Sequence, residues 1–116
     1  MNNPKFWQAL DALVLSCEIV IDRPKGSSHP RFADFAYPLD YGYLKGTQSM
    51  DGGGIDIWRG SSLGAGIVAI VITVDSAKND AEIKILLDCS EDEIMEINGV
   101  HNRKFQKGLL VRRCRT

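Results

Sequence analysis

Apolar residues near the N-terminus recur at the spacing of an amphipathic helix. Asn3 and Pro4 form a typical helix start, with Asn3 as the N-cap and Pro4 at the first helical position, where the missing N–H of proline costs nothing. The apolar positions that follow are Phe6, Leu10, Leu13 and Val14. This pattern predicts a helix over residues 4–16 that packs its apolar stripe on the core.

Much of the remaining chain alternates apolar and polar residues with the period of two that is typical of strands. We expect strands over residues 18–22, 54–59, 66–74, 82–88 and 108–114. The third of these is rich in β-branched residues, which favours a central place in a sheet. Ser90 and Glu93 have the spacing of a capping box, so we also expect a short helix over residues 91–97 that Gly99 ends.

The predicted order of elements is helix, several strands, short helix and strand, without the regular strand–helix alternation that builds parallel sheets. A chain of 116 residues has room for one hydrophobic core, so we expect a single domain over residues 1–116. Its class is mainly β (α+β). The expected architecture is a small, highly curved antiparallel sheet or an OB-like closed barrel, with the helices at the periphery.

The composition is ordinary for a soluble globular protein, with 44% hydrophobic and 25% charged residues. A net charge of −1 gives no overall attraction to nucleic acid or to a membrane surface, and we expect neither as a partner. The longest apolar run, residues 67–74, is too short to cross a bilayer, and the N-terminus lacks the pattern of a signal peptide. The three cysteines show no CxxC spacing, which favours reduced thiols and a cytoplasmic location.

Two acidic turns carry the candidate chemistry. Asp51 and Asp56 bracket three consecutive glycines, whereas a plain turn needs only one or two. Asp75 and Asp80 bracket the connection between two predicted strands. Taken alone, the first pair is equally compatible with a hairpin turn whose aspartates only bond the backbone, and the second with a polar hairpin whose aspartates face solvent. If the sheet curls into a barrel, both turns can share one rim, where four carboxylates would repel one another unless divalent cations neutralised them.

Basic residues and tyrosines surround these turns in the sequence. Taken singly, the basic residues are ordinary solvated surface, but beside a carboxylate cluster they suit an anion that arrives partly neutralised by metal. The tyrosines are spaced to project from one face of a strand, either with buried rings or with a hydroxyl that reaches a phosphate. The two sets are Arg23, Lys25, Arg31 and Lys45, and Tyr37, Tyr41 and Tyr43.

One segment carries a specific resemblance to a known family. Residues 37–57 read YPLDYGYLKGTQSMDGGGIDI, which resembles the segment of the soluble (family I) inorganic pyrophosphatases in which YPxNYGY precedes a D-x-D-x-x-D signature. Three further stretches resemble other parts of that family: RPKGS at residues 23–27, the acidic pair at residues 75–80 and KGLLVRR at residues 107–113. The similarity therefore touches most of residues 18–113.

The resemblance implies an activity, a cofactor and a set of site residues. The Mg²⁺ ligands would be Asp51, Asp56, Asp75 and Asp80, and Asp75 would hold a metal ion that arrives with the substrate. Asp22 stands where the family has a glutamate that acts on metal-bound water, so the catalytic set would be Asp22, Asp56 and Asp80. The substrate-binding residues would be Arg31, Tyr41, Lys25, Lys84 and Arg103. Mg²⁺, or alternatively Mn²⁺, suits these oxygen ligands, and the family implies a homo-oligomer.

Four departures from the family pattern bear on activity. Gly53 replaces the middle aspartate of the signature, which positions and deprotonates the attacking water in the family. The hairpin that carries a phosphate-binding arginine is missing between residues 32 and 37. Glu82 stands where a lysine is expected, and Asn102 and Arg103 stand where the family has a Tyr-Lys pair.

The sequence leaves three hypotheses. The first is Mg-dependent hydrolysis of pyrophosphate to two phosphates by metal-activated water, with Asp22, Asp80 or bulk hydroxide in place of the missing base, whose loss costs about 100- to 10,000-fold in rate. The second is a pyrophosphatase-like module that binds metal or phosphate with weak or no turnover, which Gly53 favours. The third is a small barrel that binds single-stranded nucleic acid. It would use Trp58, Arg112, Arg113 and Arg115, although a core ring and a solvated tail is the better interpretation of these residues.

Overall fold

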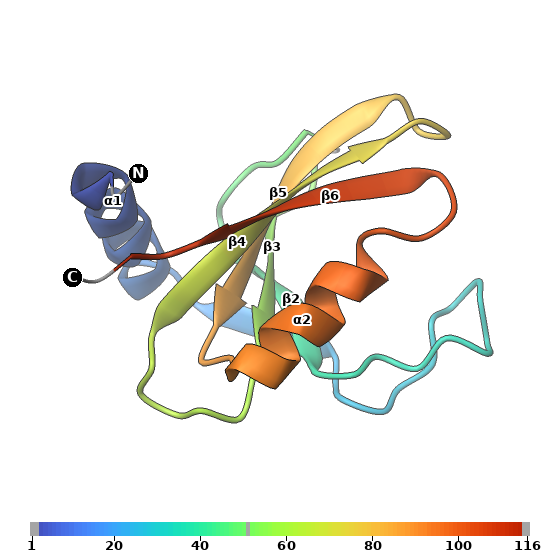
Figure 1. The fold of residues 1–116 in the computed structure, drawn as a ribbon, viewed down its shortest axis with the longest axis horizontal. Helices are drawn as coiled ribbons and strands as arrows, with labels where there is room; N and C mark the ends of the chain where they lie inside the picture. Colours follow the sequence, from blue (N-terminus) through green and yellow to red (C-terminus); the bar gives the residue numbers. More distant parts are fainter. Residues whose placement is uncertain (1–2, 51, 115–116) are drawn as a thin grey trace.

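A strongly curved six-stranded sheet with a helix on each face forms the fold (Figure 1). The computed structural model describes residues 3–50 and 52–114. Its elements are α1 (Pro4–Leu15), β1 (Ile19–Arg23), β2 (Asp40–Leu44), β3 (Ile55–Arg59), β4 (Ile67–Asp75), β5 (Asp80–Leu87), α2 (Glu91–Val100) and β6 (Gln106–Arg112). The predicted α+β class is confirmed, and each predicted strand begins and ends within two residues of its predicted bounds.

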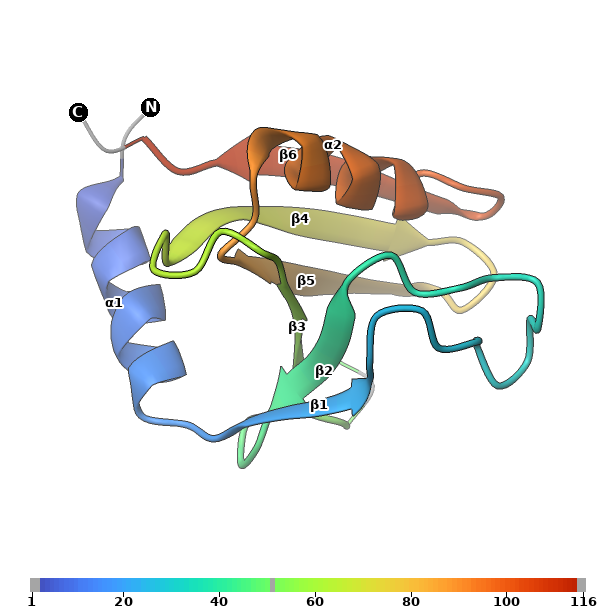
Figure 2. The ribbon, with the colours of Figure 1, turned by 90° about the horizontal axis from the view of Figure 1, so that it is seen from below.

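The strands lie in the order β1-β2-β3-β5-β4-β6. Neighbouring strands are antiparallel except β3 and β5, which run parallel because β4 and β5 form a hairpin whose second strand lies beside β3. The sheet therefore differs from the antiparallel expectation at this one pair. Figure 2 shows β4, β5 and β6 running side by side, with β1 and β2 beneath them and β2 at a steep angle to β4 and β5. Among the described strands β1 and β6 are the two edges, so the curvature stops short of a closed barrel.

Both faces of the sheet are covered, because successive side chains of a strand point to opposite faces. One face packs against α2, where Trp58, Ala69, Val71 and Leu86 of the sheet form a core cluster with Ile94 and Ile97 of the helix. The other face packs against α1, where Ile57, Ile70 and Ile85 of the sheet form a second cluster with Trp7 and Val14 of the helix. Burial on both faces explains why β4 is apolar at nearly every position.

The buried stripe of α1 starts one residue later than predicted. Trp7 is 3% exposed and packs on the core, whereas Phe6 is 44% exposed. Asn3 precedes the helix with a left-handed φ of 45°, and its side chain makes no capping hydrogen bond. Arg113 holds the helix to the end of β6, because its guanidinium donates hydrogen bonds of 2.7 and 2.8 Å to the Asp11 carboxylate and lies 5.7 Å from the Trp7 ring centroid.

The second helix begins as predicted and ends later. Ser90 and Glu93 form the reciprocal capping box, in which the Glu93 N–H donates to Ser90 Oγ and the Ser90 N–H donates to Glu93 Oε1. The helix then continues through Gly99 to Val100, so Gly99 does not end it. A glycine inside a helix costs about 0.5–1 kcal/mol, and the packing of Ile97 and Val100 on the core outweighs that cost.

Candidate active site

A cavity of about 910 Å³ lies on the face of the sheet that α2 partly covers. Alternating positions of three strands line it: Tyr41 and Tyr43 of β2, Asp56 of β3, and Glu82 and Lys84 of β5. These side chains lie on the same face of the sheet as Trp58 and Leu86. Residues paired across neighbouring strands, and alternate residues along one strand, point to the same face, and these two relations connect all of the named positions. Loop residues 29–32 and 103–105 also line the cavity, so it has a strand floor and loop walls.

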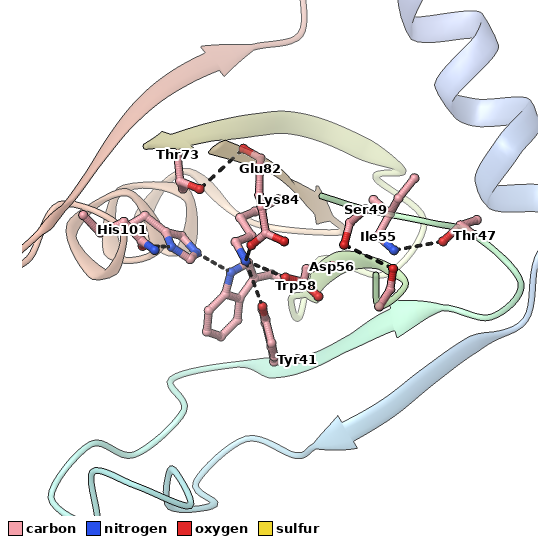
Figure 3. A network of polar contacts seen from close by, with 12 residues as sticks. Tyr41, Thr47, Ser49, Ile55, Asp56, Trp58, Thr73, Glu82, Lys84 and His101 are labelled. Atoms are coloured by element: carbon pink, nitrogen blue, oxygen red, sulfur yellow. Dashed lines mark hydrogen bonds and ion pairs between the residues drawn. The ribbon is translucent and has the colours of Figure 1, made fainter. Parts of the chain in front are cut away.

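Lys84 is the centre of the polar network on this floor (Figure 3). Its Nζ donates to the Asp56 carboxylate, to the Tyr41 hydroxyl at 3.2 Å and to Glu82 Oε1 at 3.2 Å. The parallel register of β3 and β5 creates the first contact, since it places Asp56 directly beside Lys84. The Lys84 side chain is 7% exposed. Burial alone would lower its pKa, but Tyr41 and the carboxylates of Asp56 and Glu82 raise the pKa above the ordinary lysine value, so Lys84 is an ammonium.

The Tyr41 hydroxyl stays protonated in this network. Burial raises its pKa well above the ordinary tyrosine value, and the neighbouring Lys84 ammonium opposes that shift only in part. The ring lies 4.5 Å from the Trp58 ring, centroid to centroid, which fixes the hydroxyl at the cavity floor. Tyr41 is therefore a neutral hydrogen-bonding group at the position where the resemblance places a substrate contact.

Glu82 uses one of its two carboxylate oxygens for a hydrogen bond to a described residue. Its Oε1 accepts from Lys84, whereas its Oε2 is buried and has no hydrogen-bond partner among the described residues. The side chain is 9% exposed and lines the cavity. Leaving a buried acceptor unpaired costs about 1–3 kcal/mol, more when it is charged. Such an atom beside a cavity indicates a place for a water molecule or a ligand group that donates a hydrogen bond.

Beside this network, a chain of hydrogen bonds joins Trp58 to the loop after α2. The indole Nε1–H of Trp58 donates to His101 Nε2 at 2.9 Å. Because Nε2 accepts, the proton of the neutral ring is on Nδ1, which donates to Gln106 Oε1 at 2.7 Å. Burial lowers the pKa of His101 to about 4, so the ring is neutral at physiological pH.

We expect the protein to lose stability as the pH falls from about 6.5 towards 4, because of His101. In the unfolded chain this histidine takes up a proton near pH 6.5, but in the folded protein only near pH 4. Between these values the unfolded state binds more protons, so the stabilisation is complete above about pH 6.5 and is lost on acidification. The difference between the two pKa values corresponds to about 3 kcal/mol.

Urea denaturation at about pH 7 and about pH 4.5 measures this effect, with His101→Gln as the matched variant. Glutamine offers an acceptor to Trp58 but does not titrate. The free energy of unfolding of the wild-type protein should fall more steeply with acid than that of the variant. Equal pH dependences would show that His101 makes no contribution.

Positive charge gathers around the mouth of the cavity. Besides Lys84 on the floor, the basic residues that line the cavity are Arg23, Arg31, Lys78, Arg103 and Lys104, which together are called the basic rim below. The pKa of His29 on the same wall is lowered by partial burial and then by the charges of Arg23, Arg31 and Lys78. The potential at this wall therefore favours an anionic ligand.

The cavity brings together most of the site residues that the sequence predicts. Those that line it are Asp22, Arg31, Tyr41, Asp56, Asp75, Lys84 and Arg103. Asp80 is the register partner of Asp75 in the β4–β5 hairpin but does not line the cavity. Lys25 lines a separate small pocket, and its N–H donates to Asp40 Oδ1 at 2.9 Å. Asp51 lies outside the described residues.

The described carboxylates do not fit a resident metal ion as they lie. Within residues 3–50 and 52–114 no group of three or more histidine, cysteine, aspartate or glutamate side chains is arranged to hold one. Asp56 is paired with Lys84. Asp75 Oδ1 accepts hydrogen bonds from the N–H groups of Ala77 and Lys78 at 3.0 and 3.1 Å, so this carboxylate stabilises the turn.

Sequence reasoning missed Glu82, Lys78 and His29 as parts of this site. In the sequence Glu82 stands out only as a departure from the family pattern, and no motif includes Lys78 or His29. The alternation of residues 80, 82 and 84 was the available signal for Glu82, because it places that side chain on the same strand face as Lys84. Lys78 and His29 lie in loops, where alternation gives no signal.

The described residues that the nucleic-acid hypothesis would use are buried in the core or form ion pairs within the protein. Trp58 is 1% exposed and belongs to the core, so its ring offers no stacking platform. Arg112 pairs with Glu91, and Arg113 pairs with Asp11. Arg115 lies outside the described residues. Trp7 is likewise a core residue, at 3% exposed. None of the described helices has the length and apolar character needed to cross a membrane.

Comparisons with known proteins show which fold this is. No protein-family profile matches the chain, and a search of curated proteins finds no match. Among solved structures, an inorganic pyrophosphatase from Neisseria gonorrhoeae is 19% identical, with 77% of each chain covered and a TM-score of 0.58. The inorganic pyrophosphatase from Helicobacter pylori is 14% identical, with 79% of each chain covered and a TM-score of 0.54. An inorganic phosphatase from Anaplasma phagocytophilum is also 14% identical, with 79% of this chain and 80% of that chain covered and a TM-score of 0.55.

These similarities define the fold class. The chain has the OB-like fold of the bacterial inorganic pyrophosphatases, on which the cavity and its charged residues lie. At 14–19% identity the likeness shows the fold alone, so the chemistry must be argued from the residues of the cavity.

Proposed function

We propose that this protein hydrolyses inorganic pyrophosphate to two phosphates, with the substrate entering as its magnesium complex. The observation that carries the proposal is the unpartnered Glu82 oxygen beside a cavity rimmed by basic side chains, on the fold of the pyrophosphatases. A buried acceptor next to an anion site is the arrangement that a hydrolytic water requires, because the water must lose a proton as it attacks.

The basic rim binds the diphosphate. Arg31 and Arg103 can each hold two phosphate oxygens through their planar guanidinium groups, and Lys78 adds a point charge. Asp22 and Asp75 line the same cavity, and their carboxylates suit the Mg²⁺ ion, or Mn²⁺ ion, that a diphosphate carries into the site. Such an ion, bound to the diphosphate, would lower its charge and so make the phosphorus easier to attack.

Glu82 takes the place of the missing base. Its Oε2 accepts a proton from a water molecule whose oxygen forms a new bond to one phosphorus. The bond from that phosphorus to the bridging oxygen breaks, and the bridging oxygen leaves with the electron pair on the second phosphate. Lys84 holds Glu82 through Oε1, so the opposite oxygen is the one presented to the water. The Glu82 carboxylate on β5 thus acts as the base that is missing where Gly53 replaces an aspartate.

A second candidate function is a module that binds metal-complexed phosphate without turnover. The pairing of Asp56 with Lys84 favours it, because that pairing occupies a carboxylate that the resemblance assigns to metal binding. In that case the basic rim would still bind pyrophosphate, and Glu82 Oε2 would contact a fixed water molecule or a bound ligand group.

Phosphate release from pyrophosphate by the purified protein tests the proposal, with Mg²⁺ and then Mn²⁺, beside the Asp56→Asn variant. We expect metal-dependent release by the wild-type protein and a loss in the variant. The neutral amide of that variant cannot form an ion pair with the Lys84 ammonium that orients Glu82. Circular dichroism checks that the variant is folded. Pyrophosphate binding in calorimetry without release would favour the binding module, and neither binding nor release would contradict both.

The resemblance also leads us to propose a homo-oligomer. Ile72 and its cross-strand neighbours Ile83 and Leu109 form a row across β5, β4 and β6, and they are 37%, 41% and 62% exposed. A second copy of the chain would cover this row, and light scattering would report the mass of the assembly. The cytoplasmic location stays a prediction from the sequence.

A further inference from the structure

A second pocket, of about 330 Å³, adjoins the cavity. Lys78, Arg103 and Lys104 line both spaces, so a ligand held by these side chains can extend from one into the other. The volume is within the range of small-molecule sites, which starts at about 300 Å³. Inorganic pyrophosphate, bound at the basic rim, would leave this pocket unused.

Aromatic rings line much of the second pocket. Phe32 and Tyr37 line both the cavity and this pocket, whereas Phe35, Trp58 and His101 line the pocket alone. Phe32 is 55% exposed, although burying it elsewhere would stabilise the protein. The rings that face the pocket offer apolar faces and no charge to a ligand, so they suit a planar or apolar group rather than a second phosphate.

The cations of the shared wall lie over these rings. The Arg103 guanidinium carbon is 5.5 Å from the Phe35 ring centroid, and Lys104 Nζ is 5.4 Å from the Phe32 ring centroid. The His29 and Tyr37 rings are within 11° of parallel, with centroids 6.1 Å apart. Stacked rings and guanidinium planes are the surfaces on which proteins bind planar nucleobases.

A carboxylate completes the pocket. Asp34 lines it but does not line the cavity. A carboxylate accepts hydrogen bonds from N–H and O–H groups, which a base edge and a ribose carry and an alkyl chain lacks. The combination of aromatic faces, guanidinium and carboxylate therefore favours a nucleoside over a lipid tail as the group attached to the diphosphate.

We propose that the substrates of this site are nucleoside diphosphates or related nucleotides, whose phosphates bind at the basic rim and whose base enters the aromatic pocket. The inference rests on the proposed function, since it uses the same phosphate-binding rim and the same water. The oxygen of that water bonds to the terminal phosphorus, and its proton passes to Glu82. The bond from the terminal phosphorus to the bridging oxygen breaks, so a nucleoside monophosphate and a phosphate leave.

The test compares ADP with pyrophosphate in two assays, calorimetric binding and phosphate release, both with Mg²⁺. The variants are Phe32→Ala and, as the matched control, Phe105→Ala. Both phenylalanines are exposed, at 55% and 65%, so neither substitution opens the core. Phe105 lines the cavity but not the aromatic pocket. Phe32 lines both spaces, but its ring offers no charge or hydrogen bond to a phosphate. We therefore expect Phe32→Ala to weaken ADP binding about 10-fold or more and to change pyrophosphate binding little, while Phe105→Ala changes neither.

The outcomes separate this inference from the proposed function. Release from pyrophosphate, with ADP bound no better by the wild-type protein than by Phe32→Ala, would overturn the inference and leave the proposed function standing. ADP binding that depends on Phe32, without release from either compound, would support the pocket assignment and contradict the hydrolysis. Tighter binding of geranyl diphosphate than of ADP would overturn the nucleoside in favour of an alkyl chain.

Discussion

Replacing Glu82 by glutamine should lower the rate of phosphate release about 100- to 10,000-fold while the protein stays folded. Glutamine has nearly the same shape and still offers Lys84 an oxygen acceptor, but its amide cannot accept the proton of the attacking water. The rim that binds the diphosphate is untouched. We therefore expect kcat to fall and KM to change little, which steady-state kinetics with magnesium pyrophosphate measures directly.

Two further variants make the result specific to this carboxylate. Glu96→Gln removes an exposed carboxylate on α2, away from the cavity, and should leave the kinetics unchanged. Asp80→Asn tests the residue that the family resemblance places in the catalytic set. If Asp80→Asn lost as much activity as Glu82→Gln, the base would have to lie at the β4–β5 hairpin, and the assignment of Glu82 would be wrong.

The proposed site moves one carboxylate and one cation relative to the family pattern. The loop position that normally carries the base is Gly53, which has no side chain, whereas Glu82 on β5 stands where a lysine is expected. Lys84 lies two residues further along the same strand face and contacts both Asp56 and Glu82. The loop thus lacks a carboxylate and β5 has an additional one, so the cavity contains the Glu82 carboxylate in contact with the Lys84 ammonium. If each position is compared with the family pattern separately, both changes are only losses of expected residues.

Local patterns in the sequence were enough to predict most of the fold. Alternation located β1, β3, β4, β5 and β6, but β2 was not among the expected strands. The spacing of Ser90 and Glu93 located the start of α2. Both signals depend only on neighbouring residues. The parallel pairing of β3 with β5 could not be predicted in this way. It depends on which strand of the β4–β5 hairpin lies beside β3, and that is decided by tertiary packing on two core clusters.

In the candidate site, too, local patterns predicted some of the residues, and the others depend on tertiary structure. The resemblance and the alternation predicted the tyrosines and several charged residues that line the cavity. The contact of Lys84 with Asp56 follows from the register of the parallel pair, which the sequence does not show. The aromatic pocket depends on how the loop of Phe32 and Phe35 folds against the loop of Arg103, and neither loop has a periodic pattern.

Replacing Lys84 by methionine should lower the free energy of unfolding by about 3–5 kcal/mol. The Lys84 and Glu82 side chains are 7% and 9% exposed, and Asp56 is 21% exposed. Methionine fills similar space, so the main change is that two neighbouring, largely buried carboxylates lose the one ammonium that contacts both. Chemical denaturation at neutral pH measures the loss. Lys78→Met removes an exposed lysine from the wall of the same cavity and should change stability by less than about 0.5 kcal/mol.

A double variant separates the charge effect from a packing defect. In Lys84→Met combined with Glu82→Gln, one of the two unpaired charges is gone, so the double variant should be more stable than Lys84→Met alone. The coupling energy of this cycle should be of the order of 0.5–3 kcal/mol, as for residues in direct contact. A double variant less stable than Lys84→Met alone would mean that the lysine acts through the packing of its stem. Lys84 would then have no part in presenting Glu82, because holding the carboxylate and stabilising the sheet depend on the same ammonium.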